Sequence, residues 1–211
     1  MLKQSLLCAA LLLAALPALA EDKKDAPAPP MTEEQAIAAL APDSPWAQKE
    51  LACRRLKQIG TELSVPALAG LLNDEKLSHL ARYALEPMPY PEVSAALIKA
   101  AGEATGAAKA GAIISLGARK DPAATETLVA ALKDENLDVV RAALGALGRI
   151  GDVPATEALQ EYAPNAPEPV RPALGEALLA AADNYIENGN TTRALRLLEQ
   201  LTDAQWPEHI R

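Results

Sequence analysis

The stretch Val140-Arg141-Ala142-Ala143-Leu144-Gly145-Ala146-Leu147-Gly148-Arg149-Ile150-Gly151 decides how this chain folds. Its first six residues recur, with one change, as Val170-Arg171-Pro172-Ala173-Leu174-Gly175, and its last two match Ile59-Gly60. Self-similarity at a fixed period is the signature of a repeat array. We therefore expect a stack of similar units, each about 30 residues long.

Two series of leucines carry this period through the chain. The first series recurs at a nearly constant spacing, and each of its members is followed twelve positions later by a second leucine. The two series are Leu56, Leu85, Leu116 and Leu147, and Leu68, Leu97, Leu128 and Leu159. We expect both to point into the core.

The composition favours helices. The 211 residues are 50% hydrophobic but only 3% aromatic, with no Phe. Ala is the strongest helix former and Leu is close behind it, whereas strands favour β-branched and aromatic residues. The predicted fold is all-α: an α-solenoid, a superhelix of antiparallel helix pairs.

The first 30 residues form two segments that differ in composition. Residues 1–20 combine Lys3, a short apolar run and an Ala-Leu-Ala end, which is typical of a cleaved secretory signal. The run is shorter than the roughly 20 residues of a spanning helix, although an uncleaved anchor or a buried helix stays open. Residues 21–30 are charged and Pro-rich, so we expect a disordered leader. The protein is thus expected to be exported, periplasmic or secreted, without stable membrane insertion after cleavage.

The body divides at residue 163. We expect an N-terminal capping helix, opened by a capping box at Thr32 and Gln35, and then the repeats, all within 31–163. A longer helix pair, with helices expected at 169–187 and 191–201 on either side of Gly189, fills 164–211. Residues 207–211 resemble 167–171, where a helix starts. The chain is therefore expected to be a fragment, or to end as a further repeat begins.

Local signals place the helix starts and one unusual turn. Ser44 and Ser64 are expected to cap helices at 46–59 and from 65 to about 72, and the Asp residues before Pro122 and Pro154 should do the same. Residues 86–91, Glu-Pro-Met-Pro-Tyr-Pro, form a stiff link. That link either presents Met88 and Tyr90 to a partner or only shapes a bend in the stack.

Three carboxylates are the main candidates for binding. Glu126 and Glu157 are one repeat apart in the sequence and so occupy equivalent places on successive helices, and Glu161 lies one turn beyond Glu157. Because Leu128 and Leu159 point inward, we expect these glutamates to form an acidic strip that attracts a basic partner protein. The alternative is a solvated helix face without a partner.

The remaining charged and polar residues point to no reaction. The chain has two histidines, and one cysteine, Cys53, follows the signal segment; no zinc spacing, phosphate loop or nucleophile elbow is present. We therefore expect no catalytic residue, metal or cofactor. Cys53 falls at an inward repeat position and is expected to be buried, rather than a reactive thiol. His79 is expected at a helix surface or interface.

The basic residues give no binding stripe. The net charge of −8 disfavours nucleic acid as a partner. Arg54 and Arg55 are expected to pair with nearby Glu rather than to bind anions. Arg141 and Arg171 recur at one repeat position and are expected to pair with turn carboxylates such as Asp121 and Asp152.

The Val-Arg-x-Ala-Leu-Gly and Leu-Gly-x-Ile-Gly motifs resemble HEAT repeats, in particular the short phycobilisome-lyase-type repeats. Residues 145–152 match best, the resemblance covers 44–163 and more loosely 164–205, and 53–56 and 79–87 look like exported bacterial HEAT-repeat proteins. Residues 182–195 also resemble half of a tetratricopeptide pair. The HEAT resemblance implies a scaffold for protein contacts, with the second helix of each pair on the inner concave surface. The alternatives are a phycobilin-lyase-like protein that binds a chromophore or small ligand, and the repeat portion of a larger exported enzyme.

Overall fold

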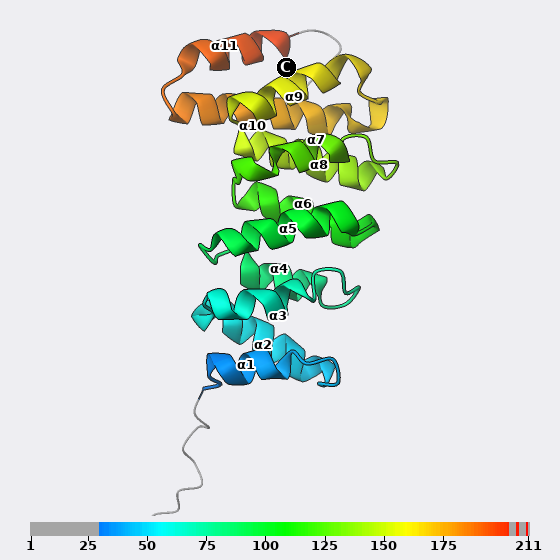
Figure 1. Ribbon diagram of the computed structural model, residues 1–211. Helices are drawn as coiled ribbons and strands as arrows, with labels where there is room; N and C mark the ends of the chain where they lie inside the picture. Colours follow the sequence, from blue (N-terminus) through cyan, green and yellow to red (C-terminus); the bar gives the residue numbers. More distant parts are fainter. Residues whose placement is uncertain (1–29, 203–205, 207–209, 211) are drawn as a thin grey trace, which may run out of the picture. The chain divides into compact units, whose positions relative to one another are not determined.

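The computed structural model describes residues 30–202, 206 and 210, and the described residues from Met31 onward form one compact unit (Figure 1). The expected signal segment and leader, and most of the segment after residue 202, lie outside the described part. The described residues form helices and turns without a strand, which confirms the predicted all-α class. The α-helices are α1 Glu33–Ala39, α2 Trp46–Ile59, α3 Val65–Ala69, α4 Ser78–Leu85, α5 Pro91–Glu103, α6 Gly106–Ala118, α7 Thr125–Ala131, α8 Leu137–Ile150, α9 Val153–Tyr162, α10 Arg171–Glu187 and α11 Thr191–Gln200.

The helices stack in two layers, as an α-solenoid requires. The first helices of the pairs, α2, α4, α6, α8 and α10, each contact the next one along the chain, and α3, α5, α7 and α9 form the second layer in the same way. Each second helix also packs against the first helix of the following pair, as α5 does on α6 and α7 does on α8. Stacking buries the apolar stripe that one pair cannot bury alone.

Both leucine series lie inside the stack, as the sequence predicts. All eight members are completely buried, and they belong to one continuous hydrophobic core that runs from Ala36 to Ile210. Burying a leucine is worth about 1.5–3 kcal/mol relative to leaving it exposed. The period of the sequence is therefore the period of the core.

The first-layer helices approach one another closely in the second half of the stack. A β-carbon on Gly117 of α6 would lie 2.7 Å from the α-carbon of Ala146 on α8. Gly148, one repeat later, meets Ala177 of α10 in the same way. Because no real side chain tolerates such a distance, only glycine allows the backbones to come this near.

The starts of the helices follow the sequence signals in part. The capping box of Thr32 and Gln35 is present, and Asp121 and Asp152 accept backbone N–H bonds at the predicted places. The predicted cap at Ser44 is wrong, because Pro45 takes the cap position and no side chain bonds to the first turn. Ser64 likewise caps nothing, because a 3₁₀ turn at Glu62–Ser64, capped by Thr61, precedes the helix.

Two further boundaries differ from those expected from the sequence. Helix α3 ends at Ala69 rather than near Leu72, because the chain turns at Gly70. Helix α10 begins at Arg171, after a 3₁₀ turn at Glu168–Val170, and not at Pro169. The final pair, α10 and α11, turns at Gly189, which has φ +75°, a backbone angle that glycine adopts readily.

Helix α1 is fastened to the first pair by one side chain. The Glu33 carboxylate accepts bonds from the Thr61 backbone N–H (2.7 Å) and from the Thr61 hydroxyl (2.9 Å). The backbone bond is the main reason why the pKa of Glu33 lies below its usual value. This contact holds the capping helix against the turn that precedes α3.

None of the described helices is both long enough and apolar enough to cross a membrane.

Candidate functional site

The three candidate glutamates lie on neighbouring second-layer helices. Glu126 is on α7 and Glu157 and Glu161 are on α9; all three are exposed, and α7 contacts α9. No ion pair joins any of them to another described residue. Leu128 on α7 and Leu159 on α9 are buried. Each of these helices therefore turns its leucine into the core and its glutamate toward solvent, as the repeat register predicts. We call these three carboxylates the acidic surface.

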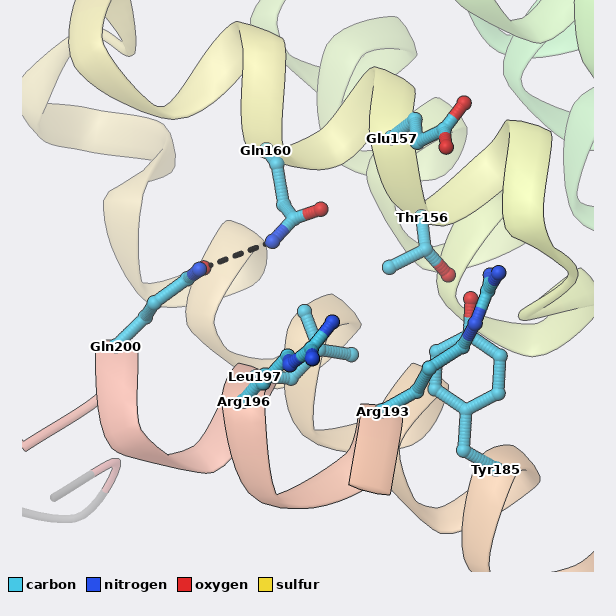
Figure 2. A pocket seen from close by; sticks show the side chains of 8 residues that line it. All are labelled: Thr156, Glu157, Gln160, Tyr185, Arg193, Arg196, Leu197 and Gln200. Carbon is cyan, nitrogen blue, oxygen red and sulfur yellow. Dashed lines mark hydrogen bonds between the residues drawn. The ribbon is translucent and has the colours of Figure 1, made fainter. Parts of the chain in front are cut away.

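A pocket of about 290 Å³ adjoins the acidic surface at Glu157 (Figure 2). It opens between α9, α10 and α11, and all of its lining residues except Leu197 are polar or aromatic with a polar tip. The Gln160 amide donates to the Gln200 side-chain oxygen at 3.0 Å across one end of the pocket. The other lining residues are Thr156, Tyr185, Arg193 and Arg196.

Two arginines of α11 bring positive charge to this pocket. Arg193 stacks on the ring of Tyr185, with 5.8 Å between the guanidinium carbon and the ring centroid, and Figure 2 shows the two side chains together. A cation over an aromatic face gains about 0.5–1 kcal/mol at an exposed site. The surface beside Glu157 is therefore mixed in charge and not purely acidic.

Sequence reasoning missed both arginines. Their spacing of three residues on a predicted helix places them on one face, which is a usable signal. What the spacing does not show is that α11 lies against α9, since that depends on the turn at Gly189.

The Pro-rich turn is fixed by Arg119, the C-cap residue of α6. The arginine Nη1 donates to the carbonyls of Glu86 (2.9 Å) and Met88 (2.6 Å), and Nη2 donates to the carbonyl of Tyr90 (3.4 Å). All three acceptors lie in the preceding repeat, so one side chain gives the turn a fixed shape.

Met88 is not presented to solvent. Its side chain is 3% exposed and lies where a side chain on Gly60 would otherwise extend. The expectation that this residue meets a partner is corrected, because the methionine fills the core at the turn. Tyr90 is half-buried and borders an open pocket with Arg119, so a binding role for it stays a prediction.

The predicted surface pairing with Glu is present for Arg54 but not for Arg55. Arg54 bridges to Glu50 of α2 at 2.9 Å. Arg55 donates to the carbonyl of Met31 at 2.9 Å and so helps to fasten the start of the described chain. These contacts account for the basic spot without a bound anion.

The predicted partners of Arg141 and Arg171 are wrong. Arg141 bridges to Asp138 in its own helix at 2.8 Å, and Arg171 bridges to Glu168 at 3.4 Å. Asp121 and Asp152 instead accept backbone N–H bonds as helix caps. Neighbours three residues away are nearer to an arginine on a helix than the turns are.

Cys53 and His79 lie where the sequence places them. Cys53 is completely buried, and burial raises the pKa of its thiol to about 11. His79 is exposed on α4. Among the described residues, no three His, Cys, Asp or Glu side chains are grouped so that they could hold a metal ion.

Residues 94–179 match the family model described as HEAT repeats. The match runs from α5 into α10 and supports a HEAT-repeat protein. No curated protein matches the chain. Among solved structures, a designed armadillo repeat protein is 19% identical over 85% of this chain and 95% of its own, with a TM-score of 0.48.

Proposed function

We propose that the protein is a non-enzymatic scaffold of the HEAT-repeat type that holds another protein at the acidic surface and the adjoining pocket. The observation that carries this proposal is the set of three exposed carboxylates on adjacent helices, without an ion-pair partner among the described residues. Such groups keep their full charge available for a partner, and charge complementarity steers association. The partner is expected to present basic residues to Glu126, Glu157 and Glu161.

The pocket beside Glu157 supports a more specific mode of contact. Its glutamine, threonine and tyrosine groups offer hydrogen bonds, and Arg193 and Arg196 offer positive charge next to the acidic surface. A partner segment that carries both signs of charge fits this arrangement better than a uniformly basic one. Interfaces typically combine a few well-placed anchors with a polar rim.

A charge-reversal capture experiment tests the proposal. The bait is the full chain, and the test bait carries Glu126→Lys and Glu157→Lys. A control bait carries Glu34→Lys and Glu187→Lys, two exposed glutamates outside the acidic surface, so that both variant baits have the same net charge. A partner held by the wild type and the control, but lost by the test bait, is the expected result.

One outcome contradicts the acidic surface as the interface, and two others contradict the scaffold proposal itself. A partner held equally by all three baits places the interface elsewhere. A coloured or small-molecule ligand that co-purifies without a partner protein favours the alternative of a lyase-like ligand carrier. Detection of a reaction that the chain catalyses favours the repeat portion of a larger enzyme.

We propose in addition that the protein is bacterial and is exported through residues 1–20, with the mature chain beginning at Glu21. The support is the sequence pattern alone: a basic residue, a short apolar run and a small-x-small end. Intact-mass measurement on the protein from the extracytoplasmic fraction of its source tests this. A mass that includes residues 1–20, or recovery from the cytoplasm alone, contradicts it.

A further inference from the structure

Arg82 occupies a place in the second repeat that the other repeats give to an apolar side chain. The equivalent residue is Cys53 in the first repeat, Ile113 in the third and Leu144 in the fourth. Those three residues are completely buried. The repeat register therefore places Arg82, which is half-buried, at a position that is core in the other three repeats, and an unpaired charge is buried there only at a cost.

No acidic side chain compensates this charge directly. No ion pair joins Arg82 to another described residue, and its Nη1 atom is buried without a hydrogen-bond partner among them. Glu86, one turn further along, accepts a bond from the Ser115 hydroxyl at 2.6 Å instead. Burial lowers the pKa of the Arg82 guanidinium, and the charge of Glu86 offsets part of that effect.

The neighbouring helix is shaped to receive the guanidinium. Arg82 lies against the α-carbon of Gly111 on α6, where a β-carbon would collide with the guanidinium carbon and both of its terminal nitrogens. Gly111 is itself inside the helix, where glycine costs about 1 kcal/mol relative to alanine. The close approach of Arg82 to α6 is thus the physical reason for a glycine at position 111.

Arg82 also lines a pocket of about 660 Å³ between the starts of α4 and α6. Thr105, Ala107 and Ala108 from the start of α6 form one wall, and no side chain caps the first turn of that helix. The uncapped N–H groups and the helix dipole favour a negative charge there. Asn73, Ser78 and His79 add further polar groups.

Two carboxylates limit which anion fits. Glu75 and Glu103 also line the pocket, and Glu103 is partly neutralised by Lys99 at 4.0 Å. A doubly charged phosphate would be repelled by these groups more strongly than a singly charged anion. A carboxylate carries one charge and matches the planar fork of a guanidinium in two parallel hydrogen bonds.

We propose that this pocket is a binding site for a carboxylate, held by Arg82 and by the first turn of α6. Arg82 already lines the pocket, so its guanidinium meets the ligand while it stays seated against Gly111. The carboxylate comes either from a small free acid or from the C-terminus of a peptide. The site shares no residue with the acidic surface, so it stands independently of the proposed scaffold.

Titration calorimetry with the full chain tests the site. The probes are acetate and inorganic phosphate, at concentrations up to about 0.1 M and at constant ionic strength so that screening does not change. The variants are Arg82→Leu, which restores an apolar residue, and Gly111→Ala, which removes the seat of the guanidinium. Arg54→Leu is the matched control, because Arg54 lies exposed on the preceding first-layer helix and pairs with Glu50.

The expected result is acetate binding to the wild type and to Arg54→Leu, with at least a tenfold loss in Arg82→Leu and in Gly111→Ala. Circular dichroism of each variant shows that the fold is kept. The proposal is overturned if the wild type binds no acetate, or if Arg82→Leu binds it as tightly as the wild type does. Tighter binding of phosphate than of acetate overturns the assignment to a carboxylate.

A pair of peptides identifies the source of the carboxylate. N-acetylated trialanine with a free C-terminus is compared with its C-terminal amide and with acetate. Binding of the free peptide at least tenfold tighter than acetate, with none by the amide, assigns the site to a peptide C-terminus. Equal affinity for the free peptide and acetate assigns it to a small free acid. Equal binding of the free peptide and its amide overturns recognition of a carboxylate.

Discussion

The second and fourth repeats share the two leucine series, but their first helices, α4 and α8, differ in length and in one core position. In the fourth repeat, α8 runs for 14 residues and ends at Ile150, and the apolar residues Leu144 and Leu147 lie one turn apart on its buried side. In the second repeat, α4 runs for 8 residues and ends before the Pro-rich turn, and Arg82 stands where Leu144 does. The stack thus continues through α4 without an apolar residue three positions before Leu85, and that position is free to hold another chemistry.

The largest expected effect comes from making the fourth repeat resemble the second. Leu144→Arg places a guanidinium in a completely buried position without a facing glycine or a pocket. An uncompensated buried charge destabilises by about 3–5 kcal/mol, so we expect a large fall in the denaturant midpoint. Leu144→Met is the control, since volume-conserving apolar exchanges cost under about 1.5 kcal/mol. Similar midpoints for the two variants would show that position 144 is not a core position.

A smaller loss of stability is expected when Arg119, which fixes the shape of the Pro-rich turn in the second repeat, is removed. Arg119→Ala removes the donor to three backbone carbonyls, the nearest of them at 2.6 Å and 2.9 Å. Leaving buried acceptors unpaired costs about 1–3 kcal/mol, measurable by urea unfolding. Arg141→Ala is the matched control in the fourth repeat, because its side chain is 42% exposed. Equal effects of the two changes would mean that the Pro-rich turn keeps its shape without Arg119.

The reverse exchange, an apolar residue in place of the arginine in the second repeat, is expected to raise the stability of the protein. Arg82→Leu replaces a charge without an ion-pair partner by the kind of side chain that the fourth repeat uses. Replacing a poorly compensated buried charge by an apolar group is often stabilising, and we expect a gain of about 1 kcal/mol without ligand. The denaturant midpoint in carboxylate-free buffer measures it. A clear loss of stability would show that Arg82 already has its partners within the fold.

The smallest effect on stability is expected in the turns that precede α4 and α8. Asp134, before α8, bridges to Lys109 at 2.8 Å, whereas the equivalent Asp74, before α4, accepts only backbone N–H bonds. The hydrogen bond from Lys109 is the main reason why the pKa of Asp134 is lowered. The carboxylate therefore adds stability that is fully present above its unfolded pKa of about 3.9 and is lost as the pH falls through the lower folded value.

Asp134→Asn should accordingly lose at most about 1 kcal/mol at pH 7, because the pair is partly exposed. The difference from the wild type should shrink as the pH falls below the unfolded pKa of about 3.9 and disappear once the pH is below the lowered folded pKa of Asp134. Unfolding curves measured from pH 7 to pH 2 test this, with Asp74→Asn as the control. A difference that is constant with pH would show that the ion pair contributes nothing.

The sequence predicts the stack well because a solenoid repeats its own core. The leucines at a fixed period, the capping box at Thr32 and the aspartate caps all act within one repeat or between neighbours. The length of α3 is not predictable in this way, because it depends on where the chain must turn to reach α4. Propensity is a weak guide for so short a helix.

Less of the candidate site than of the fold could be predicted from the sequence. The places of Glu126, Glu157 and Glu161 follow from the register. The burial of Met88 and the grip of Arg119 on the Pro-rich turn depend on contacts between one repeat and the next, which no local pattern contains. Arg82 is the exception, since aligning the repeats is enough to show a charged residue among apolar ones.

The two glycines that bring the first-layer helices together also bear on how the chain folds. Gly117 and Gly148 tie α6, α8 and α10 into a run of three closely packed helices, which has no counterpart at α2 and α4. In a repeat array, folding can begin at any repeat and spread to its neighbours, and we expect it to begin at this closely packed run. Amide hydrogens of α8 should therefore exchange last, and those of α2 and α3 first. The molecule would then open from its N-terminal end, one helix pair at a time.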